Sequence, residues 1–348
     1  MNQVPAMEWD LPLNIINGIL EKTSKRDLAR SRSVASIWCQ ASEEPRLSEK
    51  LRCENLWRSK QVLPIATRLE ESSDFRCGTK KDDLIALGGD FSLVCWNTTI
   101  GPESYVVLDV GNRVVFSVHF IDKILLSGDY KGELCGWDVD TSKSLLQFKA
   151  HSDTLWAIEE LREEVATASS DGLIKLWGKG DWKCKKVLRG HPNHVVTLSS
   201  TDDKMRLISG SLDIRIWNVA ERTCIHVFPG NYGKVIEVSR VFKGLIASRA
   251  SDEVVLVWDL NDGSVVSKFQ GDGDCSCIAM GCGRLVSGSL HGVVSVWDLE
   301  QGDCIRKLQT PPDALAFDME YPYVWLWCDD KMIIGVTDKG TCLMWDFT

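Results

Sequence analysis

Seven times along the chain, a short apolar run, a polar turn and a second apolar run follow one another and end at a tryptophan. The stretch from Val165 to Trp177, which reads VATASSDGLIKLW, shows this pattern with Asp171-Gly172 at its turn. Two strand-like runs around an Asp-Gly turn predict a tight β-hairpin. The other copies end at Trp96, Trp137, Trp217, Trp258, Trp297 and Trp345, and consecutive tryptophans lie 39 to 48 residues apart.

A repeat of about 40 residues that holds four short strands is typical of a β-propeller. The closing dipeptides of several copies resemble those of the WD-repeat family: Trp137-Asp138, Trp258-Asp259, Trp297-Asp298 and Trp345-Asp346. Gly190-His191 resembles the dipeptide that opens a repeat in this family, and Ala150-His151 is similar to it. The resemblance covers roughly residues 62 to 348 and implies a mainly β protein, a seven-bladed WD-repeat β-propeller.

Residues 8–57 do not follow the repeat and instead predict three short helices. Leu11-Pro12 opens the first helix, because proline in the first turn loses no needed hydrogen bond. Ser24 and Asp27 predict the start of a second helix, and Pro45 the start of a third that ends near Trp57. Three helices in about 50 residues make a thin core, so an apolar stripe on them indicates a protein partner.

This helical segment resembles the F-box through nine positions: Leu11, Pro12, Ile15, Ile16, Leu20, Leu28, Val34, Trp38 and Leu51. The resemblance implies a small N-terminal three-helix F-box-like module that binds the Skp-type adaptor and, through it, a cullin. The adaptor contacts that it implies are Leu11, Pro12, Ile15, Ile16, Leu28, Val34 and Trp38. The expected function is that of the substrate-recognition subunit of a Skp–cullin–F-box ubiquitin ligase, whose propeller holds a protein target. Such a subunit needs no catalytic residue, metal or cofactor of its own.

Two other readings stay open at this point. One is a ligase-independent WD-repeat scaffold whose N-terminal helices pack on the propeller as a cap. The other is an enzymatic propeller, which would need polar residues that converge at its channel.

Residues 58–72 connect the two expected domains and contain no glycine, which is not the composition of a flexible linker. Their apolar residues Val62, Ile65 and Leu69 predict one strand. The last hairpin is followed by only two residues after Asp346, so the seventh blade lacks an outer strand of its own. We therefore expect residues 61–69 to supply that strand and to join the first blade to the last, with the propeller at residues 73–348.

The net charge of −9 is unevenly distributed. Residues 1–73 hold 11 basic and 10 acidic side chains, whereas residues 74–348 hold 29 and 39. An acidic propeller argues against nucleic-acid and anionic-membrane binding, although it leaves room for a local basic pocket. The first residues lack a signal segment, no apolar run reaches a membrane span, and the 13 cysteines are scattered. We expect an intracellular protein of the cytoplasm or nucleus.

One repeat brings together His151, Ser169, Asp171 and Trp177, and a serine, a histidine and an aspartate could indicate a hydrolase. The WD-repeat resemblance instead implies a structural hydrogen-bond tetrad made of these four residues. The sequence predicts that only this copy is complete, because Asp213 of the next copy precedes its tryptophan by four residues rather than six. Cys275, Cys277 and Cys282 lack the spacing of a zinc site, and the alternate cysteines Cys275 and Cys277 on an inner strand are expected in the core.

In WD-repeat folds, the loops before the inner strands and the turns within the hairpins open on one face, and that face commonly binds partners. The positions expected there include Arg113, Lys131, Arg215, Lys234 and Arg249. Because arginine binds carboxylate and phosphate with two parallel hydrogen bonds, Arg113, Arg215, Lys234 and Arg249 are candidates for an acidic or phosphopeptide pocket. The alternative is that these cations are dispersed over the surface. The aromatic segment EYPYVWLWCDD before the last hairpin fits either core filling or an aromatic patch beside the channel.

Overall fold

The computed structural model describes residues 65–68, 74–98, 105–229, 237–249, 254–270, 275–289, 291–299, 301–310, 323–338 and 340–347. The regular elements in these ranges are all strands, so no helix among them could cross a membrane. The predicted F-box-like residues 8–57 and the candidate site residue Lys234 lie outside the described residues. The described strands belong to one compact unit, Gln61–Asp346.

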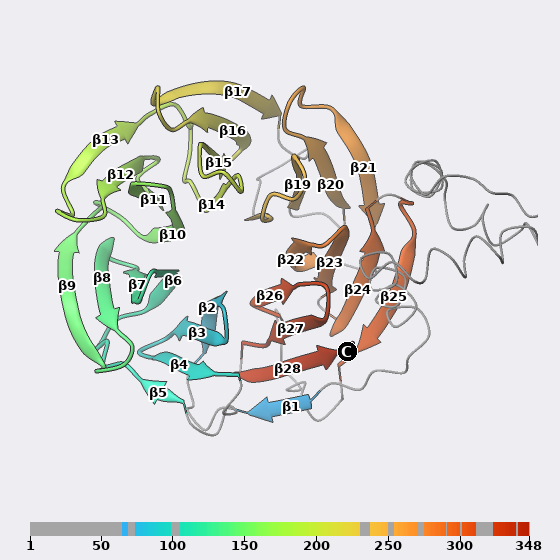
Figure 1. Ribbon diagram of the computed structural model, residues 1–348, viewed down its shortest axis with the longest axis horizontal. Coiled ribbons are helices and arrows are strands. Elements are labelled where there is room, and N and C mark those ends of the chain that lie inside the picture. Colours follow the sequence, from blue (N-terminus) through green and yellow to red (C-terminus); the bar gives the residue numbers. More distant parts are fainter. Residues whose placement is uncertain are drawn as a thin grey trace, which may run out of the picture. The chain divides into compact units, whose positions relative to one another are not determined.

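Seven four-stranded sheets follow one another around a ring, with their innermost strands directed at its centre (Figure 1). The paired strands within each sheet run antiparallel, as expected for hairpins joined in series. The first four blades, each given from its innermost strand outwards, are β2 (Phe75–Lys81), β3 (Leu84–Gly89), β4 (Leu93–Asn97) and β5 (Val106–Val107); β6 (Val115–Ile121), β7 (Ile124–Asp129), β8 (Glu133–Asp138) and β9 (Lys143–Lys149); β10 (Leu155–Glu160), β11 (Glu164–Ser169), β12 (Ile174–Gly178) and β13 (Cys184–Leu188); and β14 (Thr197–Ser200), β15 (Arg206–Gly210), β16 (Asp213–Asn218) and β17 (Thr223–Pro229).

The last three blades complete the ring and confirm the predicted seven-bladed propeller. They are β18 (Glu237–Val238), β19 (Leu245–Arg249), β20 (Val254–Asp259) and β21 (Val265–Gln270); β22 (Cys275–Gly281), β23 (Arg284–Ser289), β24 (Val293–Asp298) and β25 (Cys304–Gln309); and β26 (Trp325–Cys328), β27 (Met332–Val336), β28 (Thr341–Asp346) and β1 (Ile65–Arg68). The outer strand of blade 7 therefore comes from the other end of the propeller sequence. Strand β1 pairs antiparallel with β28, from Ile65 opposite Met344 to Arg68 opposite Thr341. This pairing covers an edge that would otherwise be open.

The core lies between neighbouring blades rather than in one central cluster. All seven repeat tryptophans are buried, with exposed fractions between 0% for Trp345 and 9% for Trp297. One apolar cluster joins Phe75 and Trp96 of blade 1 to Ile334 and Val336 of blade 7. Each blade buries its apolar faces against its neighbours. The ring is therefore closed by side-chain packing between blades 1 and 7 and by the pairing of β1 with β28.

Candidate functional site

The upper face of the propeller is defined here as the side on which each innermost strand begins. The turn between the second and third strands of a blade lies on this side, as does the connection from one blade to the next. Loops at one end of a rigid sheet are common places for binding residues. Most of the predicted site residues that the structure describes lie in these loops or beside them.

A chain of hydrogen bonds crosses blade 3 just below this face. The indole Nε1–H of Trp177 donates to Thr167 Oγ1 over 2.8 Å, and Thr167 Oγ1 lies 2.8 Å from His151 Nε2. Nδ1 of the same imidazole is 3.0 Å from Asp171 Oδ2. The predicted members His151, Asp171 and Trp177 are therefore joined, but the hydroxyl is that of Thr167 and not of Ser169. Ser169 Oγ instead donates to the carbonyl of Asp153 over 3.0 Å.

Strand register explains this correction. Trp177 of β12 lies opposite Val165 of β11, and Thr167 is two residues after Val165 on β11. The side chains of Trp177 and Thr167 therefore point to the same face of the sheet as diagonal neighbours. Ser169 points to the same face but lies about 7 Å beyond Thr167 along the strand. The same diagonal serine accepts from the tryptophan in blades 2, 5 and 6, in the pairs Ser127–Trp137, Ser248–Trp258 and Ser287–Trp297.

Blade 4 also has a complete tetrad, which corrects the expectation that only blade 3 does. Trp217 Nε1–H donates to Ser209 Oγ over 2.8 Å, and Ser209 Oγ is 2.6 Å from His191 Nε2. His191 Nδ1 is 2.6 Å from Asp213 Oδ1. The turn of blade 4 is two residues shorter, yet Ser209 keeps its place diagonal to Trp217 because Leu207 pairs with that tryptophan. The shorter turn changes the sequence spacing and leaves the geometry intact.

Burial favours the neutral form of both tetrad histidines. Burial lowers the pKa of His151 and of His191, although Asp171 and Asp213 act in the opposite direction. Since a carboxylate can only accept, each imidazole donates from Nδ1 and receives the hydroxyl proton at Nε2. Every polar side-chain atom of these two tetrads then has a partner, which stiffens blades 3 and 4 and is a structural role.

The candidate arginines are already paired with carboxylates of their own blades. Arg249 Nε lies 2.8 Å from Glu237 Oε2, and its Nη1 donates to the carbonyl of Cys275. Arg215 Nη2 lies 2.9 Å from Asp213 Oδ2. These guanidiniums therefore serve the fold, and neither carries an uncompensated charge.

Arg113 is the third paired arginine, with Nε 3.6 Å from Glu133 Oε2. Lys131 is exposed, and its Nζ lies 5.3 Å from the ring centre of Tyr130. The three arginines are held in separate ion pairs, Arg113 in blade 2 beside Lys131, Arg215 in blade 4 and Arg249 in blade 5.

A row of bulged residues at the channel mouth was not predicted from the sequence. Register shifts at the start of β2, β6 and β10 leave Arg76, Phe116 and Trp156 unpaired in the sheet. Arg76 Cζ lies 5.1 Å from the ring centre of Phe116, and the rings of Phe116 and Trp156 meet edge to face at 4.8 Å. β-Bulges re-aim side chains and are frequent beside binding sites. We call these three residues the mouth row.

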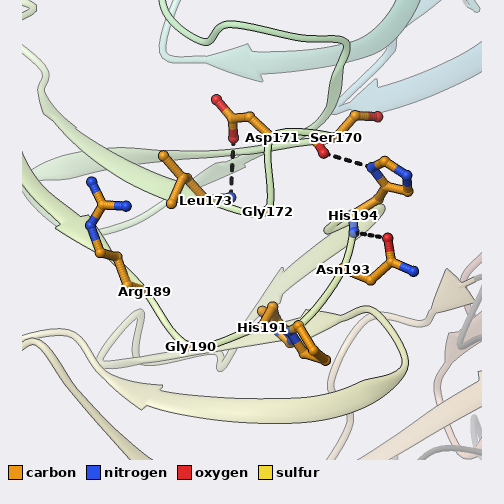
Figure 2. Close-up of a pocket in the computed structure, with 10 residues that line it drawn as sticks. Ser170, Asp171, Gly172, Leu173, Arg189, Gly190, His191, Asn193 and His194 are labelled. Carbon is orange, nitrogen blue, oxygen red and sulfur yellow. Dashed lines mark hydrogen bonds between the residues drawn. The ribbon is translucent and has the colours of Figure 1, made fainter.

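A polar pocket of about 360 Å³ lies at the turn of blade 3 and the loop that leads into blade 4. Figure 2 shows Asp171 and Leu173 on one side, Arg189 on another, and His194 with Nδ1 directed at the carbonyl of Ser170, a contact of 2.6 Å. The carboxylate of Asp171 is used by the tetrad and by the amide of Leu173. Arg189 is exposed and forms no ion pair with any residue in the described ranges.

A second pocket of about 290 Å³ shares Ser170, Asn193 and His194 with the first and so adjoins it. Its other walls include Trp156 of the mouth row and Leu212, whose side chain is 40% exposed. The indole of Trp156 donates to Ser170 Oγ over 2.6 Å, which fixes the ring at the border of the two pockets. This pair of pockets, with an apolar and a polar half, suits a protein segment rather than a small apolar ligand.

The structure places the cysteines and aromatic residues whose role was unclear from the sequence. Cys275 and Cys277 are buried, and burial raises the pKa of Cys275 to about 12, as expected for thiols in a core. No three metal-ligating side chains converge anywhere in the described ranges. Tyr323 is buried and hydrogen-bonds Thr310, whereas Trp325 and Trp327 line the channel. The aromatic segment thus supplies both core and channel.

Comparisons with known proteins agree with this architecture. No protein-family model matches the chain. The chain is 26% identical over 162 residues to the E3 ubiquitin-protein ligase COP1 of Arabidopsis thaliana, a match that covers 42% of this chain and 23% of that protein. It is 29% identical over 101 residues to transducin beta-like protein 3 of Rattus norvegicus, which covers 28% of this chain and 13% of that protein. The chain thus spans less than a quarter of the length of these relatives.

The fold is similar to that of a solved designed protein. The crystal structure of the computationally designed Ika8 protein superposes with a TM-score of 0.64 at 21% identity, over 78% of this chain and 83% of that one. With the seven tryptophan-centred blades and the two tetrads, these similarities show that the described part of the chain is a WD-repeat-like seven-bladed β-propeller.

Proposed function

We propose that this protein is the substrate-recognition subunit of a Skp–cullin–F-box ubiquitin ligase. In this proposal, residues 8–57 bind the Skp-type adaptor and the propeller at residues 73–348 binds a protein target. The observation that carries it is the combination of an F-box-like pattern from Leu11 to Leu51 with a propeller similar to part of a ubiquitin ligase. The ligase assembly then transfers ubiquitin to a target that the two domains hold nearby, since proximity raises the effective concentration of the reacting groups.

The target is expected to bind at the upper face, over the mouth row and the two adjoining pockets. An apolar target side chain fits beside Trp156 and Leu212, and an acceptor group fits near Arg189 and the imidazole of His194. Arg113, Arg215 and Arg249, which are held in ion pairs, contribute to target binding by shaping the upper face. Aromatic and arginine side chains in partly desolvated pockets commonly carry most of the binding energy of an interface.

A purified Skp-type adaptor tests the proposal directly. The full-length chain should form a stable one-to-one complex with the adaptor in size-exclusion chromatography and calorimetry. Replacement of Leu11, Pro12 and Ile15 by alanine should abolish the complex and leave the melting temperature of the propeller unchanged. A matched control is the replacement of exposed Lys143 and Lys268 on outer strands, which should change neither. An adaptor that binds the triple variant as well as the native chain would refute the assignment.

A ligase-independent scaffold is the second candidate, because transducin beta-like protein 3, which is also similar to this chain, is not named as a ligase. A scaffold whose helices cap the propeller predicts no adaptor complex. It also predicts that removal of residues 1–57 lowers the propeller's stability, whereas the receptor proposal predicts an unchanged propeller.

A further inference from the structure

A third cavity lies in the channel, near the ends of the innermost strands and therefore away from the upper face. It has a volume of about 400 Å³ and is lined by residues of β2, β6, β10, β14 and β26, with Arg240 after β18. This volume falls in the ordinary range for small-molecule sites. We call it the channel cavity.

The carboxylates of the channel cavity are largely neutralised by their neighbours. Glu159 Oε1 is 3.3 Å from Lys204 Nζ and accepts from Ser200 Oγ at 2.5 Å. Glu160 Oε1 is 2.8 Å from Nζ of Lys179, which lies outside the lining. Asp202 is then the one carboxylate of the lining without an ion pair in the part of the chain that the structure describes.

Three cations of the lining form no direct ion pair with a described carboxylate, although Lys81 is near enough to Glu160 to lower its pKa. Lys80 donates to the carbonyl of Asp82 and lies 4.1 Å from the ring centre of Trp327, and Lys81 donates to the carbonyl of Asp122. Arg240 is exposed and forms no ion pair with a described residue. The lysines belong to blade 1 and the arginine to blade 5, so the charges reach the cavity from blades that are not neighbours in the ring.

Neutral donors complete this arrangement. His119 lines the cavity, is only partly exposed, and forms no hydrogen bond with the described part of the chain. The hydroxyls of Thr79 and Ser199 also lie in the wall. Excess cationic charge with imidazole and hydroxyl groups suits an anion with several acceptor oxygens, because charge-assisted hydrogen bonds are the strongest kind available. The positive cavity contrasts with the acidic charge of residues 74–348.

We propose that the channel cavity binds a small polyphosphorylated molecule, with Lys80, Lys81 and Arg240 as its cationic contacts. A single phosphate group reaches one side of the cavity, whereas a chain or ring of phosphates reaches cations from blades 1 and 5 together. Such a ligand links distant blades and raises the stability of the folded ring, with the logarithm of its free concentration once that concentration exceeds Kd. This proposal uses none of the residues proposed for adaptor or target binding, so it stands or falls independently of the ligase proposal.

Tripolyphosphate is the probe for calorimetry and thermal unfolding of the full-length chain. We expect one saturable site that raises the melting temperature, weakens with added salt, and binds orthophosphate at least about tenfold less tightly. The double variant Lys81→Ala/Arg240→Ala should lose about tenfold or more in affinity. The matched control Lys186→Ala/Lys268→Ala removes two exposed cations from outer strands and should stay within about twofold of the native chain.

A third variant and two further ligands sharpen the test. Lys80→Met keeps an apolar stem over Trp327 and removes the charge, so it should weaken tripolyphosphate binding without loss of the fold. ATP and inositol hexakisphosphate, compared with tripolyphosphate, distinguish a nucleotide from an inositol phosphate as the source of the phosphates. Absence of saturable tripolyphosphate binding to the native chain, or equal affinity in the native chain and the double variant, would overturn the proposal.

Discussion

Thr167→Val removes one oxygen from the blade 3 tetrad and keeps the shape of the side chain. Two groups then lose their partner inside the protein: the indole N–H of Trp177 and Nε2 of His151. Thr167 and His151 are 0% and 1% exposed, so water cannot replace the hydroxyl. A buried polar group left unpaired costs about 1 to 3 kcal/mol, and two such groups should lower the free energy of unfolding by about 3 kcal/mol.

Two matched variants separate this hydroxyl from general packing effects. Thr167→Ser keeps the oxygen and removes one methyl group, which should cost only about 1 kcal/mol. Ser169→Ala removes a buried hydroxyl outside the tetrad. Its partners, the carbonyl of Asp153 and the amide of Asp171, belong to an exposed and a half-buried residue, so the loss should also cost about 1 kcal/mol. Urea unfolding followed by tryptophan fluorescence measures all three. If Thr167→Val proved no more destabilising than Thr167→Ser and Ser169→Ala, the tetrad assignment would be refuted.

Three further predictions concern pH, backbone conformation and ring closure. Because burial lowers the pKa of His151 and His191 below the usual 6.5, the unfolded chain binds more protons at these residues than the folded protein does. The free energy of unfolding should therefore fall as pH drops below about 6.5. Thermal unfolding from about pH 7.5 to about pH 5 should depend less on pH in His151→Gln/His191→Gln than in the native chain, and an unchanged dependence would contradict neutral tetrads. Gly132→Ala should destabilise the protein much more than Gly283→Ala in urea unfolding. Both glycines have φ near +78°, but only a Cβ at Gly132 would meet the backbone, 2.3 Å from the Asp153 carbonyl oxygen. Equal effects would mean that backbone strain of about 1 to 2 kcal/mol alone sets the cost of both substitutions. Deletion of residues 61–69 should expose the edge of β28, lower the melting temperature and promote self-association in light scattering, whereas a monomer of native stability would show that β1 is dispensable.

The blades follow from the sequence because each repeat ends in a buried tryptophan with a fixed place in its sheet. The number of blades and the hairpin around Asp171-Gly172 could be predicted from that spacing alone. The strand that β1 adds to blade 7 was expected because the last repeat lacked one.

The details of the site depended on register, which the sequence spacing does not give. Ser169 and Thr167 share one face of β11, and only the pairing of Val165 with Trp177 selects Thr167. In blade 4, a shorter turn hid a complete tetrad because the loop length changed while the register did not.

The ion pairs of the upper face could not be predicted from the sequence for a similar reason. Arg249 has its carboxylate directly opposite on the next strand, where Glu237 pairs with it in register, and this contact spans twelve residues of sequence. In the sequence, the residues of the mouth row are recognisable only by their spacing of 40 residues, at 76, 116 and 156. Their unpaired positions result from β-bulges, which the residue types do not predict. Cross-strand contacts of this kind need the sheet to be known.

Parallel affinity purification of the native chain, the Leu11→Ala/Pro12→Ala/Ile15→Ala variant and Trp156→Ala tests the receptor assignment most directly. We expect the first variant to lose the Skp-type adaptor and the cullin while it keeps its target proteins. Trp156→Ala should show the reverse, with adaptor and cullin retained and targets lost. Loss of both sets in either folded variant, or loss of neither, would contradict a molecule that holds its ligase through one domain and its target through the other.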